Sequence, residues 1–176
     1  MQTTGKPIIS EGLLIIMLAA INFTHIMDFV IMAPLSPFLK EAMSINTEQF
    51  GYLVSIYTFA AAGGAILAFF NIDKYDRRTA ILFLYAGFII ANVLCALAPQ
   101  YKFFMLARLF AGLFGGVLNV LIMSVIGDVI PMERRGKATG MVMAAFSAAS
   151  VLGIPSGLIL ADIFDYHAPF WLLSVL

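Results

Sequence analysis

Long apolar runs separated by short polar stretches dominate this chain of 176 residues. A helix that crosses the bilayer core, roughly 30 Å thick, needs about 20 mostly apolar residues at a rise of about 1.5 Å each. Five runs reach that length, and a sixth begins near His167 and stops at Leu176. The complete runs cover residues 12–38, 49–71, 79–98, 101–130 and 137–161. The pattern predicts an all-α membrane protein with five complete spans and a truncated sixth.

Composition supports a lipid environment. Hydrophobic residues make up 62% of the chain and charged residues 11%, whereas soluble domains average about 45–50% and about 25%. Ten Lys plus Arg balance ten Asp plus Glu, so no basic surplus predicts a nucleic-acid partner. The one cysteine, Cys95, excludes a disulfide framework and any cysteine-based metal site. The sequence has no cluster of His, Cys or carboxylate residues at the spacing of metal ligands, and no nucleophile beside a base. We therefore expect that the protein binds no metal or cofactor and is not an enzyme.

The basic residues predict how the chain is oriented, because cytoplasmic loops are enriched in lysine and arginine. Seven of them fall on one side of the predicted spans, and two, Lys40 and Lys102, fall on the other. The seven are Lys6, Lys74, Arg77, Arg78, Arg134, Arg135 and Lys137. We therefore expect an integral protein of the cytoplasmic membrane with a cytoplasmic N-terminus.

Two spans contain polar residues that are costly in lipid. Asn22, His25 and Asp28 are spaced three apart in the first span and form one stripe on a helix. The stripe is either a structural hydrogen-bond cluster or a proton and substrate site. In the fourth span, Arg108 lies on a face that continues through Gly112, Gly115 and Asn119. Arg108 either extends to the outer interface or faces a partner, and its depth is similar to that of Asp28.

The fifth run carries a proline, Pro155, between Gly153 and Gly157. A proline inside a helix removes one backbone hydrogen bond and generally bends it. This segment is therefore predicted to be a bend or gate.

Several segments together resemble the N-terminal half of a major facilitator superfamily transporter, particularly its twelve-span drug and sugar efflux branch. The resemblance covers the whole chain. Its motifs are DFVIMAPLSP at 28–37, DKYDRR at 73–78, Arg108 with Gly112, PMERRGKATG at 131–140, GIPSG at 153–157 and DYHAPFW at 165–171. The loop motif departs from the family pattern by having Lys74 in place of Arg and Asp76 in place of Gly.

The resemblance implies the N-terminal six-helix bundle of the major facilitator fold and secondary transport of a small-molecule substrate by alternating access. Asp28 would exchange protons, His25 would share them, Arg108 would tune Asp28, and Asn22 and Asn119 would offer neutral hydrogen bonds. The loop residues Asp73, Lys74, Asp76, Arg77 and Arg78 would form a conformational latch, and Gly153, Pro155 and Gly157 would let a helix bend.

The leading hypothesis is proton-coupled efflux of a small amphipathic compound. Uptake by symport or facilitation uses the same architecture, and a truncated half that only scaffolds or oligomerises is a third interpretation. Besides protons and membrane lipid, we expect the bundle to need a missing C-terminal half or a partner chain, because alternating access requires two bundles.

Overall fold

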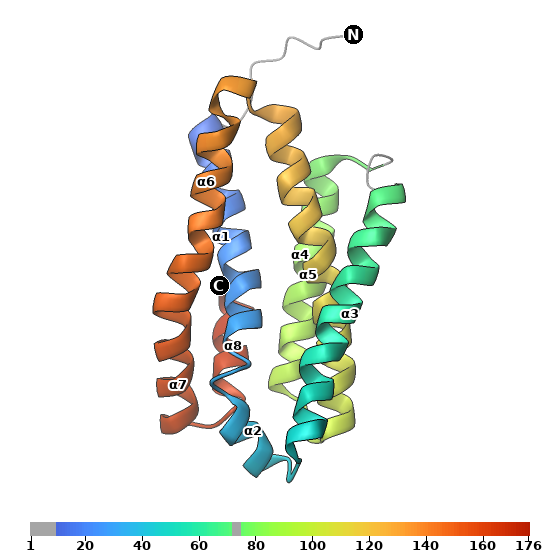
Figure 1. Cartoon of the computed structure of the whole chain (residues 1–176), viewed down its shortest axis with the longest axis vertical. Helices are drawn as coiled ribbons and strands as arrows, with labels where there is room; N and C mark the ends of the chain where they lie inside the picture. Colours follow the sequence, from blue (N-terminus) through green and yellow to red (C-terminus); the bar gives the residue numbers. More distant parts are fainter. Residues whose placement is uncertain (1–9, 72–74) are drawn as a thin grey trace.

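The computed structural model describes residues 10–71 and 75–176, and it is a bundle of helices aligned along one long axis (Figure 1). In chain order the elements are α1 (Glu11–Val30), α2 (Ser36–Ala42), α3 (Thr47–Asn71), α4 (Arg77–Ala96), α5 (Tyr101–Val129), α6 (Met132–Ala148), the π-helical turn η2 (Ala149–Gly153), α7 (Ile154–Ile163) and α8 (Ala168–Val175). The described residues contain no strand. Among them, five helical stretches are long and apolar enough to cross a membrane: α1, α3, α4, α5 and the continuous stretch Met132–Ile163. The predicted class, an all-α membrane protein that fits the N-terminal six-helix bundle, is confirmed.

Side chains next to the helix ends explain where several helices begin. Asn46 and Gln49 precede and open α3, and each side-chain oxygen accepts from the other residue's backbone N–H, at 2.8 and 2.9 Å. This reciprocal pair satisfies two donors that a helix start leaves free. At α4, the carboxylate of Asp76 accepts from the backbone N–H of Thr79 at 3.1 Å. Polar side chains at the ends of the connections therefore cap the starts of α3 and α4.

Two predicted spans have different boundaries in the structure. The first run was expected to continue to Phe38, but α1 ends at Val30 and the short helix α2 follows it. Pro34 and Pro37 lie in this region, and a proline has no N–H to donate to the preceding turn. The fifth run was expected to begin at Lys137, but α6 begins at Met132, because its charged first turn is helical although it is not apolar.

The fifth span is interrupted in the middle by η2, which ends at Gly153, two residues before Pro155. Pro155 lacks the N–H that would bond to residue 151, and its ring crowds that carbonyl. A π-helical turn widens the helix locally and accommodates this defect. The predicted special geometry at Gly153, Pro155 and Gly157 therefore takes the form of a π-bulge inside a continuous span.

Glycines bring α3 and α5 into backbone contact. A Cβ added to Gly112 would collide with the backbone of Tyr57, and one added to Gly116 would collide with the backbone of Ala61. From the other side, a Cβ on Gly64 would lie 2.5 Å from the carbonyl oxygen of Leu113. Two glycines four residues apart are a known solution for close helix packing in membranes. This contact explains why α3 and α5 lie side by side over most of their length.

The helix α1 packs mainly along α6 and η2 rather than along α5. At one end, Glu11 of α1 and Arg134 of α6 form an ion pair at 3.0 Å, so the two helices run in the same direction. Farther along, Met27 of α1 and Ile31, the residue that follows α1, lie where Cβ atoms on Gly153 and Gly157 would have to be. The π-bulge and the following helical turn therefore pack directly against the C-terminal end of α1.

We predict that Gly116→Ala destabilises the chain while Gly127→Ala does not. The added methyl group at 116 meets the backbone of Ala61, which cannot rotate away, whereas nothing lies within 4 Å of a Cβ at Gly127. The cost of such overpacking is about 1–3 kcal/mol. Thermal unfolding of the purified variants in detergent measures it, and equal melting temperatures for the two variants would contradict the proposed backbone contact.

Candidate functional site

The two charges predicted to lie at one depth form a buried ion pair. Arg108 of α5 donates from Nη1 to Oδ1 of Asp28 on α1 at 2.6 Å. The side chain of Asp28 is 0% exposed and that of Arg108 is 1% exposed. Neither charge can be hydrated at these positions, so each depends on the other. The alternative in which Arg108 extends to the outer interface is not what the structure shows.

A third residue, Tyr57 of α3, completes this cluster. The guanidinium carbon of Arg108 lies 4.3 Å from the centre of the Tyr57 ring, in a cation–π arrangement. Tyr57 is buried, and its backbone is held against Gly112. Sequence reasoning missed this residue, because one tyrosine in an apolar run has no distinguishing signal. The stripe of small residues that begins four positions later at Ala61 could have suggested that this face meets another helix.

Several polar atoms of the cluster have no hydrogen-bond partner among the described residues. They are His25 Nδ1, Asp28 Oδ2, Tyr57 OH and Arg108 Nε. Leaving a buried polar atom unpaired costs about 1–3 kcal/mol, so four of them in one place single out this cluster as a candidate functional site.

The imidazole of His25 reaches this cluster because α5 has no side chain at position 115. A Cβ on Gly115 would lie 2.5 Å from His25 Cδ2 and 3.2 Å from the hydroxyl oxygen of Tyr57. Gly115 was predicted only as part of the Arg108 face. The structure gives it a specific role, which is to let two polar side chains approach the helix.

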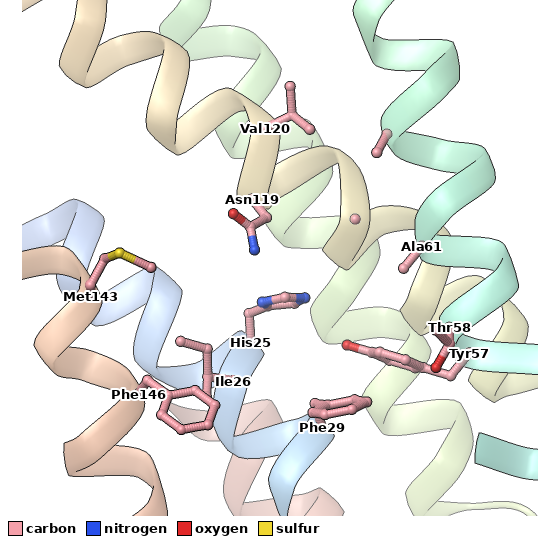
Figure 2. Close-up of a pocket in the computed structure, with 12 residues that line it drawn as sticks. His25, Ile26, Phe29, Tyr57, Thr58, Ala61, Asn119, Val120, Met143 and Phe146 are labelled. Carbon is pink, nitrogen blue, oxygen red and sulfur yellow. The ribbon is translucent and has the colours of Figure 1, made fainter. Parts of the chain in front are cut away.

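The structure divides the predicted polar stripe of α1. His25 and Asp28 join the cluster, whereas the Asn22 amide donates to the carbonyl oxygen of Val142 on α6 at 3.0 Å. The Asn22 amide therefore makes a structural hydrogen bond between α1 and α6. Asn119, one turn beyond Gly115 on α5, is exposed and lies on the other side of a cavity from His25 (Figure 2).

That cavity has a volume of about 460 Å³ and lies between α1, α3, α5 and α6. Figure 2 shows the amide of Asn119, the ring of His25 and the hydroxyl of Tyr57 pointing toward one another in it. Phe29 and Phe146 line the other part, and both are exposed. The cavity thus has a small polar centre in an apolar, partly aromatic wall.

The predicted loop motif is only partly covered, because Asp73 and Lys74 lie outside the described residues. Arg77 forms an ion pair with Asp128 at the end of α5, with both Nε and Nη2 at 3.0 Å from Oδ2. Arg78 is exposed. Hydrogen bonds from the backbone and hydroxyl of Thr79 hold the pKa of the Asp76 carboxyl below its usual value. The partner Asp128 was not predicted from sequence, because it lies 51 residues away from Arg77.

Comparison with known proteins gives a consistent assignment. The profile of the family described as Major Facilitator Superfamily matches residues 18–176. The chain is similar to "Uncharacterized MFS-type transporter YwfA" of Bacillus subtilis, with 33% identity over 81% of this chain and 35% of that protein. It is 31% identical to "Multidrug resistance protein 3" of the same species, over 71% of this chain and 24% of that protein.

A third relative is the "Probable sugar efflux transporter" of Helicobacter pylori strain ATCC 700392 / 26695. Its identity is 26% over 84% of this chain and 37% of that protein. The match therefore spans about a third of the length of YwfA and of the sugar efflux transporter.

We predict strong coupling between Asp28 and Arg108 in a double-mutant cycle of stability. Asp28→Asn or Arg108→Gln alone leaves one buried charge without its partner, which costs about 3–5 kcal/mol. The double variant removes both charges and is expected to lose much less than the sum of the two single losses. Thermal unfolding in detergent gives the coupling energy. Asp128→Asn, which removes one partner of an exposed pair, is the control and is expected to cost at most about 1 kcal/mol; additive losses at Asp28 and Arg108 would contradict the pair.

Proposed function

Since this chain belongs to the major facilitator superfamily, we propose that it forms the proton-coupling half of a secondary transporter that exports small amphipathic compounds. One observation carries the proposal: a fully buried Asp28–Arg108 pair with unpaired polar atoms lies beside an apolar cavity. Intramembrane ionisable groups that face protein or water are typical of proton and substrate pathways. A scaffold would have no need for such a costly pair.

The proton step follows from the different chemistry of the two charges. Asp28 can accept a proton and become neutral, whereas a guanidinium keeps its charge under all physiological conditions. When Asp28 is protonated, the attraction to Arg108 is lost, and the ring of Tyr57 remains next to the cation. His25, one helical turn from Asp28, would pass the proton between the carboxylate and the cavity. Protonation therefore weakens the link between α1 and α5 without removing the charge of α5.

The π-bulge in the fifth span would allow the helices to move when Asp28 is protonated. Met27 and Ile31 flank Asp28 on α1 and contact the segment that contains Gly153 and Gly157. When α1 moves away from α5, the π-bulge would be the compliant part of the neighbouring span. The Arg77–Asp128 pair at the end of the bundle would latch one of the two states.

Alternating access needs a second bundle against which this one can rock. We propose that the second bundle is the C-terminal half of a longer gene product or, failing that, a partner chain. The relatives support this, since the match spans 35% of YwfA. The printed names of two relatives, a multidrug resistance protein and a sugar efflux transporter, favour export over uptake for this chain.

We predict that the bundle sits in the cytoplasmic membrane with its N-terminus in the cytoplasm. The end of α3, the start of α4 and the α5–α6 turn lie at the same end of the bundle as the start of α1 (Figure 1), and Arg77, Arg78, Arg134, Arg135 and Lys137 belong to these segments. Single cysteines at Asp76 and Arg135 should react with a membrane-impermeant maleimide only after the cells are opened. A cysteine at Lys102, at the opposite end, is the matched control and should react in intact cells. The reverse labelling pattern would show that the orientation is wrong.

We predict that Asp28→Asn abolishes proton coupling. The experiment uses inside-out membrane vesicles that contain the gene product, with an acidic lumen reported by a quenched acridine dye. Substrate that enters the lumen is exchanged for protons that leave it, and the loss of protons from the lumen restores the fluorescence. Candidate compounds are an aromatic alcohol, a lipophilic cation and a pentose.

The variant should give no recovery of fluorescence at any pH, because an amide cannot take up the proton. Asp162→Asn, an exposed aspartate of α7, is the control and should behave as the parent chain does. Immunoblotting of the membranes checks that both variants are present in equal amounts. Recovery with unchanged pH dependence in Asp28→Asn would remove Asp28 from the mechanism.

A further inference from the structure

The charges closest to the cavity neutralise each other and are shielded from it. Asp28 and Arg108 are fully buried against one another, and the ring of Tyr57 covers the guanidinium. None of the residues that line the cavity is an aspartate, glutamate, lysine or arginine. A charged ligand would lose its hydration there without gaining a counter-ion, which is unfavourable by several kcal/mol on the order-of-magnitude scale for unpaired ions.

Polar atoms in the cavity are few, and they lie close together. His25 Nδ1 and Tyr57 OH have no partner among the described residues, and no bond from the Asn119 amide to a described residue is present. In Figure 2 the His25 ring lies between the Asn119 amide and the Tyr57 hydroxyl. Thr58 also lines the cavity, but its hydroxyl already donates to the carbonyl oxygen of Val54 at 3.0 Å. The cavity can therefore satisfy one hydroxyl, ether or carbonyl group, and not several spread over a molecule.

The apolar part of the cavity wall is suited to a flat ring system of a ligand. Phe29, Phe146 and Met143 are exposed, although they are large and apolar, and all three line the cavity. Aromatic and thioether surfaces pack well against flat apolar molecules. The ring of Tyr57 is already engaged by Arg108, so a cation would have only the phenyl faces of Phe29 and Phe146, which attract cations weakly compared with a carboxylate.

We infer that this cavity binds uncharged molecules that combine an apolar ring system with a single hydrogen-bonding group, and that it rejects both ions and sugars. The inference rests on the proposed transport function, since it names the substrate class of that site. A sugar has a hydroxyl on almost every carbon, and most of these would face Phe29, Val120 or Phe146 without a partner.

The test compares three naphthalene derivatives of the same size and different charge: naphthol, naphthoate and naphthylmethylammonium. Saturable binding to the complete gene product in lipid nanodiscs is measured at neutral pH by equilibrium dialysis, with empty nanodiscs subtracted and arabinose as the sugar. Naphthol should bind at least about tenfold more tightly than either ion, and arabinose should show no saturable binding. Tighter binding of an ion or of arabinose, or no saturable binding of naphthol, would overturn the inference.

Two variants locate the bound hydroxyl. Tyr57→Phe keeps the ring beside Arg108 and removes only the hydroxyl, and it should weaken naphthol binding about fivefold, the equivalent of one hydrogen bond. Asn119→Leu, at an exposed position of α5, should weaken it by a similar factor. Tyr52→Phe is the control, because its hydroxyl bonds to Glu48 outside the cavity, and it should bind naphthol as the parent chain does. Unchanged affinity in both Tyr57→Phe and Asn119→Leu would show that naphthol binds elsewhere.

Binding does not require proton-driven flux, so the two proposals fail separately. Charge-selective binding in a protein without proton-coupled flux would leave the inference standing and remove the transport function. Proton-coupled export of a lipophilic cation through the cavity would support the transport function and overturn the inference about substrate charge.

Discussion

Two opposite charges that share one dry position between α1 and α5 determine much of this bundle. A carboxylate and a guanidinium without water are stable only in contact, and the 2.6 Å bond between Asp28 and Arg108 provides that contact. Everything around the pair is arranged to allow it. Gly112 brings the backbone of α3 close enough for Tyr57 to cover the cation, and Gly115 makes room for His25 beside the pair.

The same arrangement produces the cavity. Because small residues occupy the surface of α5 that faces α1 and α3, polar side chains from those helices fill only part of the space. The rest is bounded by exposed aromatic and methionine side chains from α1 and α6. Close packing at Gly116 and an open cavity beside it are therefore two effects of one glycine-rich helix face, since Gly116 also lines the cavity.

The sequence predicted the parts of this structure that depend on the cost of polarity in lipid. A charge inside an apolar run has to find a partner, so Asp28 and Arg108 could be placed at one depth before any contact was known. Tyr57 could not be identified in this way, because a tyrosine is compatible with a lipid interface, a core or a site. Asp128 was missed for another reason: its pairing with Arg77 depends on how two helix ends meet, and pattern alone does not give that. The end of α1 was placed too late, because apolar residues continue past Pro34 although the regular helix does not.

The bundle contains two helix pairs of different stiffness. Backbone contacts at three glycines join α3 and α5, whereas α1 rests on a span that carries a π-bulge. Arg108, Tyr57 and Asn119 belong to the stiff pair, and Asp28 and His25 belong to the pliable one. The Asp28–Arg108 ion pair joins one helix pair to the other. Any molecule that wedges α1 away from α5 therefore separates the carboxylate from the guanidinium without having to touch either charge.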